Sequence, residues 1–330
     1  MLGCRKTFCW PSGAWVLGFA LLAAGCAQPT STAAPRASAD TLNWDFDGSP
    51  GRVLKTEHYL IHTTIEDTAF LQSLVQVMEG AMQEYRKLTP GVQVSSKPLE
   101  CYVFSRRPQW EQFTRQNTGA DATIYLQINR GGYTVHDWFV AYFIGDVGTF
   151  AVAAHEGWHQ FVARHFKSRL PPFLEEGMAT MFENISWSLS GPSWNMVSNP
   201  NRADKLRLAI QDKSLWSLDE LCTMHAGDVV SLSGERIETF YAQNWAFAQF
   251  LIHAENGRFK PRMNQMLQDL ASGAADAYTG HPRPPSDAWD PRTVRPLLEH
   301  YLGMSMTEID AAYQGYIRKI AFAIRNDRTY

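Results

Sequence analysis

The segment "AVAAHEGWHQFVARHF", residues 151–166, brings together side chains whose types and spacing could do chemistry. It contains His155 and His159 four residues apart, with Glu156 beside the first. On an α-helix, residues four apart differ by about 40° around the axis and lie one turn apart, so the two imidazoles would project side by side. Such a pair can share a divalent cation, and the carboxylate between them can reach a water at that cation. The segment therefore predicts two ligands of a zinc site.

The third ligand of such a site has two candidates in the sequence. A catalytic zinc ion takes three protein ligands and leaves its fourth position to water, so one more ligand is required. His165 has the spacing of the last histidine in the pattern HExxHxxGxxH. That pattern needs a glycine where this chain has Val162, and a β-branched residue resists the positive φ that would break the helix there. His165 is therefore expected to point away from the metal.

The other candidate lies in the segment "LPPFLEEGMATMFE", residues 170–183. Pro171 and Pro172 end the first helix and begin a second one, whose apolar positions suit a packed helix. Glu175 and Glu176 are about 100° apart on this helix, so only one of them is expected to face inward. The alternative is that both carboxylates are solvated in the first turn, where the helix dipole favours them.

The motif "HEGWH" followed by "FLEEGMA" resembles the gluzincin metallopeptidases, in which HExxH is followed on a second helix by the pattern L-x-E-G-x-A. The glutamate directly before the glycine is the third zinc ligand of that family. The resemblance implies one Zn²⁺ ion held by His155, His159 and Glu176, with Glu156 as the general base on a zinc-bound water. It also implies a zincin-like catalytic region and hydrolysis of peptide bonds in a peptide or protein substrate.

The segment "FYAQNWAFAQFLI", residues 240–252, resembles the helix of aminopeptidase-type gluzincins that begins with a catalytic tyrosine. The resemblance implies that the Tyr241 hydroxyl donates a hydrogen bond to the oxyanion. Asn244 stands where that helix usually has glycine, and a core aromatic residue is the alternative interpretation of Tyr241. Zinc-bound histidines are oriented by further polar groups, for which Glu183 and Thr180 are candidates.

One element of the aminopeptidases is missing from the sequence. The segment G-x-M-E-N, whose acidic residue grips the α-amine of the substrate, does not occur between residues 90 and 150. The likeness is closer to exported bacterial proteins of the peptidase-MA-like group, and it covers about residues 130–255. The alternative function is a non-catalytic, zinc-stabilised envelope lipoprotein that binds a partner or an envelope component. A chain without any metal is a third hypothesis.

The elements around these motifs predict an α+β fold in two parts. Residues 45–145 are expected to form a small α+β subdomain, with a strand pair at 52–65 and a helix at 67–88. The segments "ATIYLQI" and "GGYTVHDWFVAYF" are expected to be strands around a Gly-Gly turn, and the first is a candidate edge strand for an extended substrate. Residues 146–330 are expected to form the helical, metal-binding catalytic subdomain, with helices at 148–166, 172–184, 202–212, 239–254, 260–271 and 305–323.

The N-terminus has the pattern of an export signal followed by a tether. Arg5 and Lys6 precede the apolar run "AWVLGFALLAAG", which is short for a bilayer span, so residues 1–25 are predicted to be a lipoprotein signal peptide. The sequence "LLAAGC" resembles a bacterial lipobox, which implies lipid attachment at Cys26; an ordinary secretory signal is the alternative. Residues 26–44 are expected to be a flexible tether. These features predict a bacterial cell-envelope protein, anchored by lipid at the periplasmic face of a membrane.

Composition excludes one class of partner and leaves a redox question open. The net charge of −3 over 330 residues offers no basic field for nucleic acid, so no nucleic-acid partner is expected. Beyond Cys26, the chain has Cys101 and Cys222. They are expected to form either a disulfide or two buried thiols.

Overall fold

The computed structural model describes residues 40–229, 231–281 and 290–323, which belong to one compact unit. The predicted signal peptide 1–25 and the predicted lipidation site Cys26 lie outside the described residues. The predicted tether 26–44 is too long, because strand β1 (Asp40–Phe46) already begins at Asp40. Within the described ranges, we find no helix with the length and apolar character needed to cross a bilayer.

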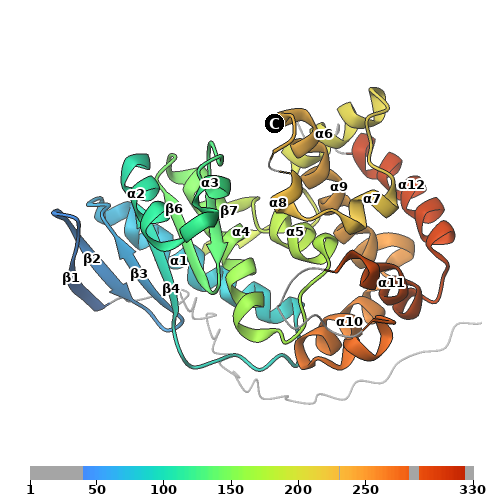
Figure 1. Ribbon diagram of the computed structural model, residues 1–330, viewed down its shortest axis with the longest axis horizontal. Helices are drawn as coiled ribbons and strands as arrows, with labels where there is room; N and C mark the ends of the chain where they lie inside the picture. The colour runs from blue at the N-terminus through green and yellow to red at the C-terminus, as the bar shows by residue number, and fades with distance from the viewer. Residues whose placement is uncertain (1–39, 230, 282–289, 324–330) are drawn as a thin grey trace, which may run out of the picture. The chain divides into compact units, whose positions relative to one another are not determined.

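A six-stranded mixed sheet forms the first part of the α+β fold (Figure 1), with the strand order β1-β2-β3-β4-β6-β5. Strands β3, β4 and β6 are parallel neighbours, while β1-β2, β2-β3 and β5-β6 are antiparallel pairs. Strand β5 is therefore an edge of the sheet. The remaining strands of this sheet are β2 (Ser49–Lys55), β3 (Tyr59–Thr63), β4 (Leu99–Phe104), β5 (Gly132–Val135) and β6 (Trp138–Tyr142).

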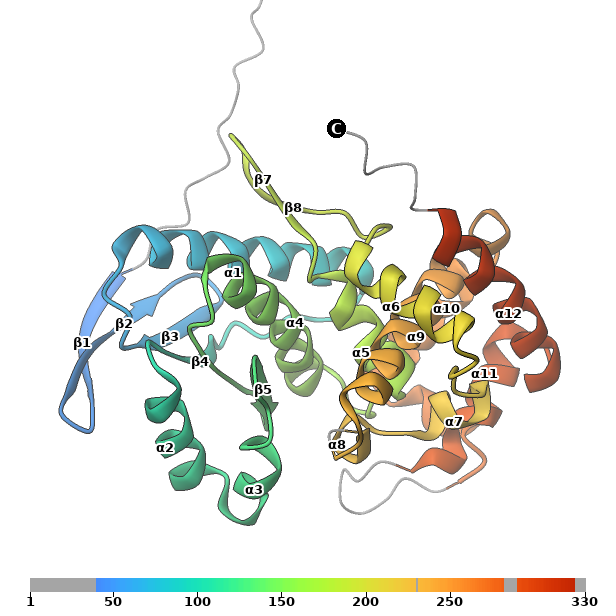
Figure 2. The ribbon, with the colours of Figure 1, turned by 90° about the horizontal axis from the view of Figure 1, so that it is seen from above.

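The two faces of this sheet are covered by different helices. Successive side chains of a strand point to opposite faces, so Val103 belongs to the core shared with α1 (Thr68–Leu88) and α4 (Asp146–His165). The next residue, Phe104, belongs to an aromatic cluster with Trp110 of α2 (Arg107–Asn117) on the other face. Figure 2 shows α1 and α2 on opposite sides of the sheet. The α1–α4 side is the one that faces the metal-ligand candidates.

The second part of the fold is helical, as the sequence predicts, and it shares one hydrophobic core with the α1–α4 face of the sheet. Helix α5 packs closely against α9. A short hairpin, β7 (Ile185–Ser188) and β8 (Gly191–Trp194), follows α5. The helices of this part are α5 (Pro172–Met181), α6 (Pro200–Gln211), α7 (Leu218–Thr223), α8 (Ala226–Val229), α9 (Gly234–His253), α10 (Lys260–Ser272), α11 (Val294–Leu302) and α12 (Met306–Ala323).

The prediction of a strand in "ATIYLQI" is wrong. This segment forms the short helix α3 (Ala122–Tyr125), whose end is closed by the amide of Leu126 donating to the carbonyl of Ala122. The chain reverses between β5 and β6 at His136, which has a positive φ of 55°, and not at the Gly-Gly pair. Strand β5 takes the edge position beside β6, so the edge that faces α4 is β5.

The redox question is resolved by the positions of the two thiols. Cys101 and Cys222 are both free and buried, so they are not joined in a disulfide. Burial raises the pKa of both thiols, which makes them weak nucleophiles. They contribute to packing.

Gly177 of α5 allows the close contact between α5 and α9. A Cβ at this position would lie 2.5 Å from the carbonyl oxygen of Asn244 and 3.0 Å from the Cβ of Ala248. We expect Gly177→Ala to lower the free energy of unfolding by about 1–3 kcal/mol, because the helices must separate. Denaturant unfolding measures this. The control is Gly315→Ala in α12, where a Cβ meets nothing within 4 Å and alanine should stabilise the helix; equal stability of both variants would contradict the prediction.

Candidate metal centre

Helix α4 presents its two histidines on the face opposite its core residues. Trp158 and Phe161 are fully buried on the core side, whereas His155 and His159 line a cleft. Gly157 leaves room for Tyr85 of α1, because a Cβ there would lie 2.7 Å from the Tyr85 hydroxyl oxygen. That hydroxyl donates to the carbonyl of Ala154 at 2.5 Å. The contact fixes α4 on α1 and so fixes where its histidines project.

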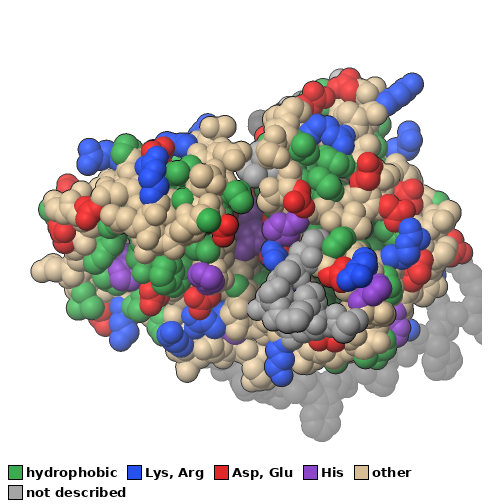
Figure 3. Space-filling view, in the orientation of Figure 1, with side chains coloured by type: hydrophobic (Ala, Val, Ile, Leu, Met, Phe, Trp, Pro, Cys, Tyr) green, Lys and Arg blue, Asp and Glu red, His purple; other side chains and the backbone are tan. Residues whose placement is uncertain are grey.

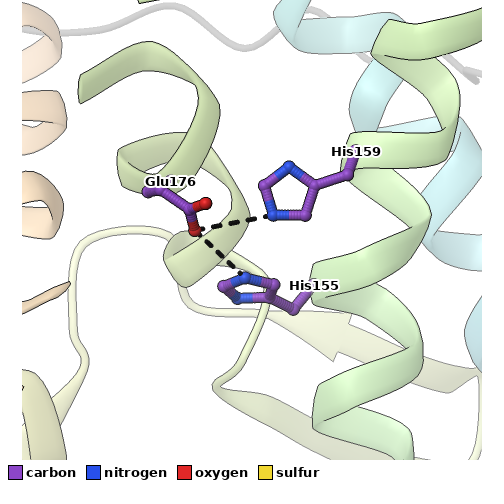
Figure 4. A group of neighbouring side chains, drawn as sticks. All are labelled: His155, His159 and Glu176. Carbon is purple, nitrogen blue, oxygen red and sulfur yellow. Dashed lines mark ion pairs between the residues drawn. The ribbon is translucent and has the colours of Figure 1, made fainter. Parts of the chain in front are cut away.

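The structure brings the three predicted metal ligands together (Figure 4). Oε2 of Glu176 lies 3.4 Å from Nε2 of His155 and 3.5 Å from Nε2 of His159. The side chains are 9–12% exposed, so little water competes for these atoms. The inward carboxylate of the pair on α5 is thus Glu176, as predicted, and the alternative in which both glutamates are solvated is excluded.

The geometry of these atoms fits a zinc ion. Zinc bonds to histidine nitrogen and carboxylate oxygen of about 2.0–2.2 Å in tetrahedral geometry place ligand atoms about 3.3–3.5 Å apart. The Glu176 Oε2 atom is buried and has no hydrogen-bond partner among the described residues. A buried oxygen without a partner is costly, and a cation shared with two imidazole nitrogens would satisfy it. Two histidines and one glutamate are also a known ligand set for catalytic zinc.

The outer nitrogen of His155 is held by Glu183. Nδ1 of His155 lies 3.1 Å from Oε1 of Glu183. A carboxylate oxygen can only accept, so Nδ1 carries a proton, and Nε2 is the ring nitrogen left to face a metal. Glu183 was one of two candidates from the sequence. The other, Thr180, instead donates to the backbone carbonyl of Gly177 and does not reach the histidines. The outer nitrogen of His159 lies farther from a carboxylate, 3.8 Å from Oε1 of Glu175.

The electrostatics of the site favour positive charge at the histidines. Burial lowers the pKa of His155, but contacts with Glu176 and Glu183 outweigh it and raise the pKa to about 10. The pKa of His159 is raised as well, because Glu176 outweighs the effect of burial. Burial opposes the ionisation of Glu183, yet Arg202 and His155 lower the pKa of this carboxyl to about 2. The same negative potential would hold a divalent cation.

Glu156 is oriented from the edge of the sheet. The Thr134 hydroxyl of β5 lies 3.0 Å from Oε2 of Glu156 and 3.0 Å from the backbone carbonyl oxygen of the same residue. Both residues line the cleft. The Glu156 carboxylate therefore stands beside the histidine pair in the cleft, held by the Thr134 hydroxyl.

Tyr241 of α9 lies next to His155 in the cleft. Its ring centroid is 6.3 Å from that of His155, and its side chain lines the cleft. Burial raises the pKa of the phenol well above its usual value, so the hydroxyl keeps its proton at neutral pH. A protonated phenol in this position can donate a hydrogen bond into the cleft.

His165, the rejected third-ligand candidate, points away from the site as predicted. Its Nδ1 atom lies 2.7 Å from the carbonyl oxygen of Phe161, one turn back along α4. Its Nε2 atom accepts a hydrogen bond from the backbone amide of Ser95 at 3.0 Å. Both ring nitrogens are thereby used in fixing the C-terminal end of α4.

A cleft of about 880 Å³ gives access to these groups. It is lined by the edge strand β5, by α3 and α4, by the start of α8 and by Tyr241. Figure 3 shows histidine side chains inside a hollow on this face. The cleft is large enough for several residues of an extended peptide.

Three residues around the site were not identified from the sequence: Thr134, Asn199 and Arg202. Asn199 donates to Oε2 of Glu183 at 3.0 Å and caps the N-terminus of α6. An Asn-Pro pair at a helix start is a readable capping signal, but it does not reveal the contact with Glu183. Thr134 and Arg202 carry no local signal, because each reaches the site through tertiary packing.

Comparisons with known proteins place the site inside one family segment. Residues 149–269 match a family described as "Protein of unknown function (DUF1570)". The three ligand candidates, Glu156 and Tyr241 all fall within this match. Searches of curated proteins and of solved structures gave no match.

Proposed function

We propose that the protein is a zinc-dependent peptidase of the gluzincin type, acting on peptide bonds in the cell envelope. The observation that carries the proposal is the convergence of His155, His159 and Glu176 on one point, with an orphaned carboxylate oxygen at its centre. Glu156, which is not part of this triad, stands beside it in an open cleft. A purely structural zinc site would be closed and would need no such residue.

The side chains of this chain divide the work of amide hydrolysis. A zinc ion bound by His155, His159 and Glu176 would supply a Lewis acid that activates water and polarises the scissile carbonyl. Glu156 accepts the proton of the attacking water and passes it to the leaving amine. Tyr241 donates its hydroxyl proton as a hydrogen bond to the carbonyl oxygen as negative charge develops there.

The edge strand gives an extended substrate a place to bind. Strand β5 pairs with β6 on one side and lines the cleft on the other. A peptide that adds to this edge by main-chain hydrogen bonds would pass beside Thr134 and Glu156. This role, expected from the sequence for "ATIYLQI", is now proposed for β5.

The proposal extends to location. The predicted lipid attachment at Cys26 lies 14 residues before the first residue of β1, Asp40. An anchored chain would therefore keep its cleft close to a membrane surface on the periplasmic side. Substitution of Cys26 by serine, followed by fractionation of cells, tests the anchor independently of activity.

Digestion of a mixed peptide library by the zinc-loaded full chain tests the function. We expect cleavage that stops when a chelator removes the metal and returns when zinc is restored. An intact library in the presence of zinc-loaded protein would contradict the peptidase proposal. In that case the alternative, a zinc-stabilised lipoprotein that binds an envelope component, would become the better interpretation.

Replacing Tyr241 by phenylalanine is expected to lower kcat for peptide cleavage by about a hundredfold, because one donor to the developing oxyanion is lost. The ring and its packing remain, so zinc affinity should not change. Steady-state kinetics on a cleaved library peptide measure the effect. The matched control is Tyr316→Phe in α12, which lies outside the cleft. Unchanged kcat in Tyr241→Phe would assign this tyrosine to the core, as the alternative from the sequence has it.

A further inference from the structure

Arg202 is a buried cation that touches both sides of the proposed catalytic machinery. It lies in α6, and its side chain is 13% exposed. Its Nε and Nη2 atoms donate to the two oxygens of Glu183 at 2.9 Å and 2.6 Å. Its Nη1 atom donates to Oε2 of Glu238 at 3.3 Å. The same guanidinium carbon lies 5.1 Å from the ring centroid of Tyr241.

The contact with Arg202 fixes the orientation of the Glu183 carboxylate plane and does more than balance its charge. Two parallel hydrogen bonds from a guanidinium hold a carboxylate in one orientation, which a lysine cannot do. Oε1 of Glu183, fixed in this way, accepts from Nδ1 of His155. The orientation of the His155 ring therefore depends on Arg202 through Glu183.

The second contact of Arg202 is with Tyr241, the proposed hydrogen-bond donor to the oxyanion. A guanidinium over the face of an aromatic ring attracts it, more strongly in a site with little water. Glu183 and Glu238 hold the guanidinium in this place by hydrogen bonds. The ring of Tyr241 is thereby held beside His155.

We infer that Arg202 is a positioning residue that sets the orientation of both His155 and Tyr241 from one guanidinium. The inference rests on the proposed function, since it concerns the metal ligand and the oxyanion donor of that same site. Arg202 is not one of the three proposed metal ligands and does not line the cleft. It acts on zinc affinity through Glu183 and on turnover through Tyr241.

Two double-mutant cycles on the full chain separate these routes. Zinc affinity is measured by competition with a chromophoric chelator, and kcat is measured at saturating zinc. We expect Arg202→Met to weaken zinc binding by about tenfold, the usual effect of losing a group that orients a ligand. In the Glu183→Gln background the same substitution should change zinc affinity by less than about twofold, because the carboxylate that links Arg202 to His155 is already absent. In the Tyr241→Phe background its effect on kcat should largely disappear.

Matched variants keep the test decisive if the buried glutamate destabilises Arg202→Met. The double variant Arg202→Met/Glu183→Gln removes both charges. Arg202→Lys keeps the positive charge but loses the two parallel hydrogen bonds to the carboxylate. Arg202→Lys should fold and still bind zinc more weakly than wild type. Arg207→Met, on the same helix and paired with Asp204, is the control and should change nothing.

Specific results would overturn the inference. Wild-type zinc affinity in Arg202→Lys, or equal effects of Arg202→Met with and without Glu183, would show that the guanidinium does not orient His155. An effect on kcat of the same size in the Tyr241→Phe background would show that it does not act through the tyrosine. Failure of the proposed function would give a different result. The wild-type protein would bind zinc, and the effects of Arg202→Met and Glu183→Gln on zinc affinity would still be coupled, but no peptide would be cleaved.

Discussion

Replacing Glu156 by glutamine should reduce peptide cleavage by about a thousandfold while the chain still binds one zinc ion, because an amide cannot accept the proton of the attacking water. The amide has nearly the same shape and can keep its contact with the Thr134 hydroxyl. His155, His159 and Glu176 are untouched by the change. Rates on a library peptide and the zinc content of the dialysed protein measure the two halves of this prediction.

The control for this substitution is another glutamate to which the mechanism gives no role. Glu84 lies on α1 and pairs with Lys87, so Glu84→Gln should retain wild-type rates. If Glu156→Gln cleaved the peptide at the wild-type rate, Glu156 would not be the general base. If it lost its zinc, the carboxylate would belong to the metal site, and the division between ligands and base would be wrong. A function in binding alone would persist in Glu156→Gln.

The features predicted correctly from the sequence are those that local geometry determines. The four-residue spacing of His155 and His159 places them within reach of one ion only if the segment is helical, because in a strand they would share a face but lie about 13 Å apart. The small apolar residues before them favour a buried helix. Pro172 is the first residue of α5, as predicted, whereas α4 already ends at His165 and is not ended by the prolines. The rejection of His165 rested on Val162 continuing the helix, and α4 does continue through both residues.

The features that sequence reasoning missed depend on contacts between distant segments. The β-branched and aromatic residues of "ATIYLQI" favour a strand, but β5 occupies the edge of the sheet beside β6, and the segment folds as α3. Arg202 reaches Tyr241 because α6 packs against α9, and from the same helix it reaches Glu183, which follows α5 in the chain. Thr134 reaches Glu156 because β5 packs against α4. No spacing in the sequence encodes either contact.

Replacing Glu176 by glutamine is expected to weaken zinc binding by more than about a hundredfold, beyond the effect of losing an orienting group. Zinc is held by deprotonated ligands, and the neutral amide takes away the anion that faces both Nε2 atoms. Because binding to the folded state stabilises it, saturating zinc should raise the Tm of the wild-type chain. In Glu176→Gln the Tm should not respond to zinc. Equilibrium dialysis and thermal unfolding with and without zinc measure these effects.

The neighbouring carboxylate supplies the sharpest control. Glu175 has the same chemistry on the same helix, but it lies 3.8 Å from Nδ1 of His159, on the outer side of the ring, and within 4.0 Å of Arg169. Glu175→Gln should therefore keep its zinc and its thermal response, with at most a modest loss of affinity. Comparable losses in both variants would mean that total negative charge holds the ion. A loss confined to Glu176→Gln would mean that the ion is held by one carboxylate oxygen at the meeting point of two imidazoles, and the proposed mechanism requires this second result.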